Sequence, residues 1–207
     1  MTDFNELFVD VDAYRPVGRW QTWARDLVVW VMMLMLLLAG WQFKEWMMTQ
    51  FRYLALAESA PAIPYPAQWL PQPAPDQVLL VLDPHSQSVF PAREEVVVAP
   101  LPETDIVIAW PEHRQGALQD YHELDRMKVT LSDDSPALLL TYTYVAETDA
   151  SQPAPLTVVR ASDLAFVVDD GHADRLVVLT LAADINEWEE RQPLFQRILQ
   201  QLGVPGP

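Results

Sequence analysis

Hydrophobic and polar positions divide the chain into an apolar N-terminal part and a strand-like C-terminal part. Residues 27–43 read LVVWVMMLMLLLAGWQF and contain no charged side chain. As a helix this run spans about 25 Å, and Trp23 and Ala24 extend it toward the thickness of a bilayer core. The pattern predicts one transmembrane helix. Indole side chains, which favour the membrane–water interface, lie near both ends of the run: Trp20, Trp23, Trp41 and Trp46.

A cleaved secretory signal and a buried core helix are the alternatives for this run. A signal has a short basic leader and a small-x-small cleavage site. Here a long leader with five Asp or Glu residues precedes the run, and LLLAGWQF offers no such site. A core helix would leave residues 1–60 without a partner domain. We therefore expect a permanent membrane anchor.

The basic residues beside the run predict its orientation. Cytoplasmic flanks carry more Lys and Arg than exported ones, and here three precede the run and two follow it. We expect residues 1–26 to form a cytoplasmic tail, and the C-terminal domain to be periplasmic or otherwise extracytoplasmic on a single-pass cell-membrane protein. The flanking basic residues are Arg15, Arg19 and Arg25 before the run, and Lys44 and Arg52 after it.

The segment after the run is rich in helix formers. KEWMMTQFRYLALAESA contains neither Pro nor Gly, so we expect residues 27–60 to hold the transmembrane helix and a juxtamembrane extension. The extension either continues as a helix out of the membrane or lies on the membrane surface or a neighbouring subunit as an amphipathic helix. Residues 61–75 contain six prolines, which predicts a linker that merges into a domain over residues 63–203.

Beyond the prolines the hydrophobic period changes to that of strands. DDGHAD, with Asp170–Gly171, is a strong hairpin signal, and Gly203 is a natural C-terminal helix cap. Runs of strands with few helices indicate an α+β fold, here an antiparallel-sheet α/β sandwich. The predicted elements are strands at Gln77–Asp83, Glu95–Ala99, Asp105–Trp110 and 136–147, a helix at Gln115–Met127, two strands around DDGHAD, and a closing helix whose apolar face is Trp188, Phe195, Ile198, Leu199 and Leu202.

Charge separates the two parts further. The 207 residues carry a formal net charge of −16. Residues 1–60 hold five of the 13 Lys and Arg and seven of the 29 Asp and Glu, which leaves eight against 22, a net of −14, beyond them. This balance argues against nucleic acid as a partner, because phosphate binding needs clustered Lys and Arg. The absence of cysteine excludes disulfides and thiolate chemistry.

Candidate chemistry is sparse. The histidines show no metal-ligand spacing, although His113 with Glu112, or His122 with Glu123, could join a site through folding; surface histidines are the simpler interpretation. The paired aspartates fall at predicted turns, where Asp is favoured. No nucleophile elbow or phosphate loop is present. We expect no enzyme, no metal and no cofactor, and we assign no cofactor-binding residue. The residues in question are His85, His113, His122 and His172, and the pairs Asp133–Asp134 and Asp169–Asp170.

Several short motifs, in order, resemble PsbP-like proteins, the family of photosystem II extrinsic subunits and their bacterial relatives. YPAQW (Tyr65–Trp69) resembles the family's entry motif, VLDPHSQSVFPAREEVVVAP its following hairpin, and LAFVVDDGHADRLVVLTLAA with EWEERQPLFQRILQQL its last hairpin and closing helix. The sequence departs from the family at Gln68, where Gly is usual, at Gln201–Leu202, and in its N-terminal helix. The resemblance implies the family's α+β fold and a non-catalytic accessory role beside membrane complexes of electron transport.

We therefore expect a non-catalytic accessory subunit of a multi-subunit membrane complex, plausibly of photosynthetic or respiratory electron transport, whose domain covers an extrinsic face. The expected partners are other subunits and the lipid bilayer, and the acidic surface could also dock a basic soluble electron carrier. A freestanding membrane-anchored binding or assembly-factor module is the alternative. The residues expected to contact neighbouring membrane helices are Trp30, Met32, Met33, Met35, Trp41 and Trp46.

Overall fold

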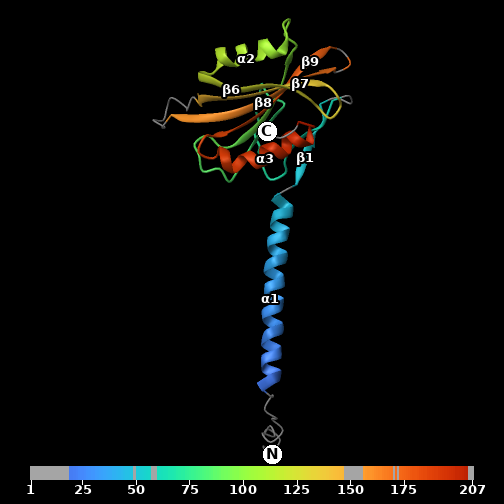
Figure 1. Cartoon of the computed structure of the whole chain (residues 1–207), viewed down its shortest axis with the longest axis vertical. Coiled ribbons are helices and arrows are strands. Elements are labelled where there is room, and N and C mark those ends of the chain that lie inside the picture. Colours follow the sequence, from blue (N-terminus) through green and yellow to red (C-terminus); the bar gives the residue numbers. More distant parts are fainter. Residues whose placement is uncertain are drawn as a thin grey trace, which may run out of the picture. The chain divides into compact units, whose positions relative to one another are not determined.

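The computed structural model describes residues 19–48, 50–56, 60–146, 156–169, 171 and 173–204. Its contacts divide the chain into two compact units, Met1–Thr49 and Gln50–Pro207. The second unit contains a seven-stranded sheet and two helices among its described residues. The fold class predicted from the sequence is confirmed: one N-terminal apolar helix precedes an α+β domain built on an antiparallel sheet (Figure 1).

Helix α1 is the described element of the first unit. It runs from Arg19–Met48, and within it Trp23–Lys44 is long and apolar enough to cross a membrane by length and composition. That span has 22 residues and a mean hydropathy of 1.8, and none of its most apolar part is buried within the chain. Apolar side chains surround the helix, as in a membrane span, instead of forming one stripe.

The predicted helical extension to residue 60 is wrong. The helix ends at Met48, and Phe51–Leu54 forms strand β1, which pairs antiparallel with strand β2, Ile63–Pro66. Helix propensity did not decide this segment, because Phe51 and Leu54 pack against the core of the domain. Residues 57–59 lie outside the described part of the chain.

The proline-rich segment is more than a linker. Strand β2 and the short strand β3, Leu70–Pro71, both lie in it. Ile63 is fully buried and Trp69 is 2% exposed. Prolines at sheet edges cost no ladder hydrogen bond when their nitrogen faces outward. The segment therefore supplies part of the domain's core.

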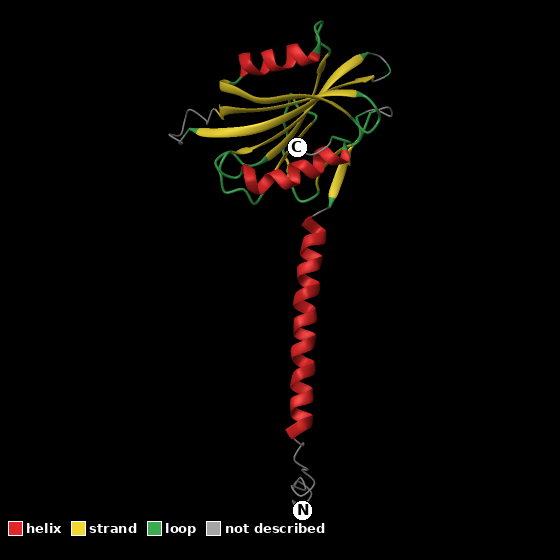
Figure 2. Cartoon of the chain, viewed as in Figure 1, coloured by secondary structure: helices red, strands yellow, loops and turns green. Residues whose placement is uncertain are grey.

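The large sheet lies between two helices. Its strand order is β3-β4-β5-β9-β8-β7-β6, and all neighbouring pairs are antiparallel. Figure 2 shows helix α2 on one face of the sheet and helix α3 on the other. The bounds are β4 Leu79–Leu82, β5 Arg93–Pro100, α2 Ile106–Ala117, β6 Gln119–Thr130, β7 Pro136–Ala146, β8 Thr157–Asp169, β9 Asp174–Asp184 and α3 Trp188–Gln201.

Two predicted elements have the wrong type. The strand predicted at Asp105–Trp110 is the first half of helix α2, and the helix predicted at Gln115–Met127 is mostly edge strand β6. An edge strand that is exposed on most positions carries charges that discourage pairing with other chains. The many charged and exposed residues of β6 therefore resemble those of a solvated helix, and the pairing with β7 identifies the segment as a strand.

The predicted turns and the closing helix are confirmed. Ser135 donates from its backbone nitrogen to Asp133 Oδ1, and Gly171 does the same to Asp169 Oδ1, so both aspartates act as turn residues. Helix α3 ends in a Schellman motif, in which Gly203 N–H donates to the carbonyl of Gln200 and Val204 N–H to that of Leu199. Asp170 and His172, both in the predicted hairpin, lie outside the described residues.

Candidate functional site

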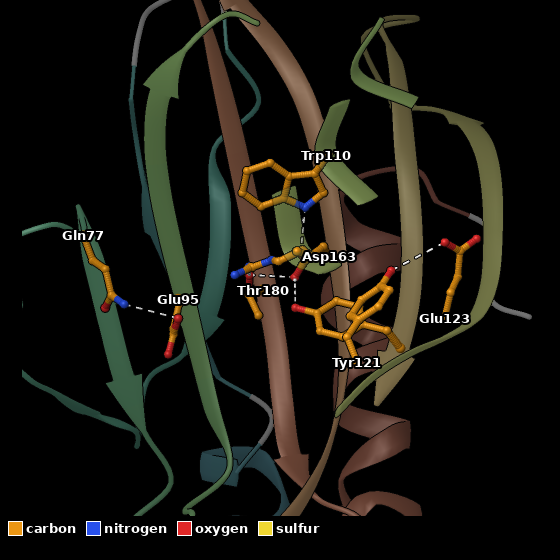
Figure 3. Close-up of polar contacts among 9 residues, drawn as sticks. Gln77, Glu95, Trp110, Tyr121, Glu123, Asp163 and Thr180 are labelled. Carbon is orange, nitrogen blue, oxygen red and sulfur yellow. Dashed lines mark hydrogen bonds and ion pairs between the residues drawn. The ribbon is translucent and has the colours of Figure 1, made fainter. Parts of the chain in front are cut away.

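The centre of the α2 side of the sheet is a buried carboxylate with four donors. Asp163, on β8, is fully buried. Its Oδ2 accepts hydrogen bonds from Trp110 Nε1 and Arg114 Nε, each at 2.7 Å. Its Oδ1 accepts from the hydroxyl groups of Thr180, at 2.8 Å, and Tyr142, at 3.1 Å. Figure 3 shows Trp110 and Thr180 directed toward Asp163.

Local sequence explains why these groups meet. Asp105 caps α2, because its side chain accepts the backbone N–H of Val107 at 3.0 Å. Trp110 and Arg114 are four residues apart and so share one face of that helix. Asp163 and Thr180 are direct register partners on β8 and β9. One helix face and one strand pair therefore assemble the cluster.

Electrostatics strengthens the cluster. Burial works to lower the pKa of Arg114, but the negative charge and hydrogen bond of Asp163 raise it well above its ordinary value. Burial, together with the charge of Asp163, raises the pKa of Tyr142 well above its ordinary value. Arg114 therefore remains a cation and Tyr142 a neutral donor throughout the range in which proteins function.

The cluster is suited to fixing structure more than to reacting. Two donors occupy each oxygen of Asp163, and Thr180 in turn accepts a hydrogen bond from Arg114 Nη2 at 2.8 Å. A carboxylate with all its lone pairs engaged is a poor base, because proton transfer would require breaking one of these bonds. Its evident role is to hold α2 on the sheet.

A row of aromatic rings leads away from this cluster; we call Phe90, Tyr144, Tyr142 and Tyr121 the aromatic strip. Successive ring centroids are 6.3, 6.0 and 5.3 Å apart. Arg93 lies over the ring of Phe90, with its guanidinium carbon 3.7 Å from the centroid. Tyr144, Tyr121 and Arg93 are half-buried, which leaves part of each ring or guanidinium accessible.

Polar neighbours border the strip at both ends. Arg93 pairs with Glu95 at 3.6 Å, and Glu95 accepts a hydrogen bond from Gln77 Nε2 at 3.2 Å. At the other end, the Tyr121 hydroxyl donates to Glu123 at 3.5 Å (Figure 3). Burial, followed by the charge of Glu123, raises the pKa of Tyr121 to about 12. Tyrosine and arginine at a partly exposed site of this kind are typical of protein-binding surfaces.

Of the predicted membrane-contact residues, five lie on α1 and are exposed in the single chain: Trp30, Met32, Met33, Met35 and Trp41. With 3.6 residues per turn, Trp30, Met33 and Trp41 fall within about 80° of one another, and Met32 and Met35 lie on roughly the opposite side. The structure therefore does not bring them together into one contact stripe. Trp46 lies in the same helix, but its side chain is outside the described residues.

The histidines make no shared site among the residues that the structure describes. No group of three His, Cys, Asp or Glu side chains there could hold a metal ion. The ring of His113 lies against Trp110 at 5.1 Å, His122 is exposed on edge strand β6, and His85 Nδ1 is 3.4 Å from Asp83.

Sequence reasoning missed the Asp163 cluster. The available signal was an aspartate inside the otherwise apolar strand of RASDLAFVV, because an acid in such a run is rarely buried without partners. The Trp110-x-x-x-Arg114 spacing became meaningful only once residues 106–117 formed a helix.

Comparison with known proteins leaves the family open. No family model matches the chain, and no curated protein matches it. Among solved structures, the chain is similar to LpqN, involved in cell envelope biogenesis of Mycobacterium tuberculosis, with a TM-score of 0.47 and 12% identity over 76% of this chain and 89% of that one. It is also similar to the Ran-binding protein Mog1p of Saccharomyces cerevisiae, with a TM-score of 0.46 and 12% identity over 74% of this chain and 93% of that one.

The expectation that this chain is a PsbP-like protein of the photosystem II family is contradicted. No family model matches, and the similar solved structures include LpqN and Mog1p. Similarity at this level carries no argument about function. What the chain does must therefore be inferred from its own residues.

Proposed function

We propose that this protein is a membrane-anchored, non-catalytic binding protein. The observation that carries the proposal is helix α1, whose span Trp23–Lys44 exposes apolar side chains on every side. Such a helix needs a lipid environment, because no face of it is polar enough to remain in water. Because Met32 and Met35 lie on roughly the opposite side of the helix from Trp30, lipid contact is favoured over one fixed helix partner.

The domain is proposed to bind another protein through the aromatic strip. Its half-buried residues Tyr121 and Tyr144 offer contact area with few rotatable bonds, and Arg93, stacked on Phe90, adds a cation beside them. The acidic balance of the chain, −16 overall, would steer a partner that presents a basic surface. A membrane-complex subunit and a soluble basic carrier both satisfy this chemistry. Membership in an electron-transport complex was expected only from the PsbP-like resemblance, so the proposal stops at the class of binding protein.

Membrane anchoring is tested on the full chain in its native membranes. We expect it to resist alkaline carbonate extraction and to retain residues 1–26 when its intact mass is measured. Recovery of a soluble, shortened chain would show a cleaved signal and overturn the anchor. Because the chain lacks cysteine, Thr2→Cys and Val89→Cys can each be labelled with an impermeant maleimide. Labelling of the second variant alone from outside is expected for a cytoplasmic N-terminus and an exported domain.

Binding is tested by placing a photo-crosslinking amino acid at Tyr121 in the full chain. We expect a discrete adduct that weakens as salt increases, and co-migration with a larger assembly after gentle detergent extraction. The matched control places the same amino acid at Arg197, an exposed position on α3. Equal adducts at both positions, or a free monomer in the extract with no adduct, would contradict a role for the strip.

A further inference from the structure

A cavity lies on the face of the sheet opposite the Asp163 cluster, between helix α3 and strands β6, β7 and β8. Its volume is about 210 Å³. Met127 and Leu139 supply apolar walls from the sheet, and Phe195 and Leu199 supply them from α3. The hydroxyl groups of Thr141 and Ser162, 3.2 Å apart, add a polar patch to the floor. This site shares no residue with the aromatic strip and does not depend on the proposed function.

Two buried donors at this cavity have no acceptor. Trp188 lines it and is only 5% exposed, yet its indole Nε1 makes no hydrogen bond in the described structure. The Nε of Arg160, another lining residue, is likewise buried and unbonded. Native proteins rarely leave buried donors unpaired, so each such group calls for an explanation. Two of them at one cavity indicate a missing acceptor.

The charges around the cavity specify what that acceptor is. The guanidinium carbon of Arg160 lies 4.9 Å from the ring centroid of Trp188, which holds a cation against the cavity wall. The acidic lining residue, Asp125, is exposed and accepts the backbone N–H of Arg126 at 2.9 Å. An anion in the cavity therefore has Arg160 as its cationic partner and meets the carboxylate of Asp125 only at the cavity rim. One arginine and one indole N–H suit a single carboxylate.

We propose that this cavity binds a small monocarboxylate with an apolar tail. Its size exceeds that of an apolar cavity of about 150 Å³ that accepts benzene and is below that of pockets for drug-sized ligands, so the ligand has one small ring or a short chain. The carboxylate accepts hydrogen bonds from Arg160 and Trp188 once the half-buried guanidinium turns from the indole toward the cavity. The tail packs between Leu139 and Phe195.

The test uses the full chain in lipid nanodiscs with ¹⁵N-labelled tryptophan, titrated with benzoate. The indole resonance of Trp188, assigned with Trp188→Phe, is expected to shift with a dissociation constant of about 10 μM to 1 mM. The resonance of Trp110, which donates to Asp163, serves as an internal control for folding and is expected to stay in place. Benzyl alcohol, which lacks the charge, is expected to bind at least about tenfold more weakly.

Variants make the result decisive. Arg160→Gln is expected to weaken benzoate binding at least about tenfold, and Arg197→Gln, the same charge change on the exposed surface of α3, to leave it unchanged. An unmoved Trp188 resonance up to about 10 mM benzoate overturns the proposal. Benzoate binding that is as tight in Arg160→Gln as in the unchanged chain, with the Trp110 resonance in place, also overturns it. Benzyl alcohol binding that is as tight as benzoate binding does the same. If Arg160→Gln shifts the Trp110 resonance, its folding has changed. The proposal is then tested with Arg160→Lys and with the benzyl alcohol comparison.

Discussion

Arg114, on helix α2, donates from its Nε to Oδ2 of Asp163, on strand β8, at 2.7 Å, and the Asp163 side chain is completely buried. The sequence separates these residues by 49 positions. Their contact is the main polar link between α2 and the sheet. Trp110 shares the same carboxylate oxygen, so Asp163 accepts two hydrogen bonds from α2.

Breaking this pair is expected to be costly. Arg114→Leu leaves Asp163 as a buried charge without its counter-ion, which should lower the free energy of unfolding by about 3–5 kcal/mol. Urea unfolding of the full chain in detergent, monitored by tryptophan fluorescence, measures this.

The matched control is Arg126→Leu, because Arg126 pairs with Glu123 at the surface at 2.6 Å. A loss of at most about 1 kcal/mol is expected there. In a double-mutant cycle, Arg114→Leu combined with Asp163→Leu should recover part of the stability. Similar losses for Arg114→Leu and Arg126→Leu would show that the buried pair is not special.

Glu94 gives the domain an unusual dependence of stability on pH. It is fully buried on β5, neither of its carboxylate oxygens has a partner in the described structure, and burial raises its pKa well above the ordinary value. The folded state therefore binds this proton more tightly than the unfolded state. The contribution of Glu94 to stability is complete below the unfolded pKa near 4.5 and is lost as pH rises toward the folded pKa.

Glu94→Met should abolish this loss and stabilise the domain at pH 7 by about 1–3 kcal/mol, since it removes a buried group without partners. Glu94→Gln should remove the pH dependence but keep much of the cost, because its amide stays unpaired. Unfolding curves recorded between pH 5 and pH 8 compare the three chains. A parallel pH dependence in all three would rule out Glu94 as its source.

Gly203 should tolerate no side chain. Its φ is +88°, and a Cβ at this position would lie 2.5 Å from the backbone nitrogen of Ser132. That nitrogen donates to the carbonyl of Leu202, which ties the β6–β7 turn to the end of α3. Gly203→Ala is expected to lower the free energy of unfolding by more than the roughly 1–2 kcal/mol that a left-handed conformation alone costs an L residue, because the turn must also move.

The melting temperature of the full chain checks this expectation. Gly171→Ala is the control, since Gly171 also has a positive φ, +81°, but among the described residues no atom beyond its chain neighbours lies within 4 Å of its hypothetical Cβ. Equal shifts for the two variants would mean that backbone strain, and not the close approach to Ser132, sets the cost.

Charges in the middle of α1 should release the protein from membranes. Leu34→Arg with Leu37→Arg places two cations where each costs about 2.5–3.5 kcal/mol in a bilayer centre. The fraction of the chain that stays in the membrane pellet after alkaline washing is expected to fall sharply. Val89→Arg with Ile108→Arg, at exposed positions of the domain, should leave it unchanged. If the chain with Leu34→Arg and Leu37→Arg remains in the membrane pellet, the prediction that α1 is a membrane anchor is wrong.

Local patterns predicted those parts of the domain in which local preference and tertiary packing agree. Strand β4, the β8–β9 hairpin and helix α3 with its Gly203 cap all follow from short-range periodicity and turn chemistry. The failures occur where tertiary contacts override propensity. Residues 106–108 are β-branched and favour a strand locally, yet Trp110 and Arg114 gain partners only when the segment is helical.

The sequence by itself determined the apolar helix, because a run without charges at Leu27–Phe43 leaves its backbone and side chains no favourable alternative in lipid. It also determined the α+β class through the strand period. Only the tertiary structure decided where the polar groups go. Asp163, Glu94 and Arg160 all lie on strands of one sheet. Asp163 is satisfied by four donors, Glu94 has no side-chain partner among the described residues, and Arg160 lies at an open cavity. Those differences arise from which helix covers each face of the sheet, and this is set by packing between residues far apart in the chain.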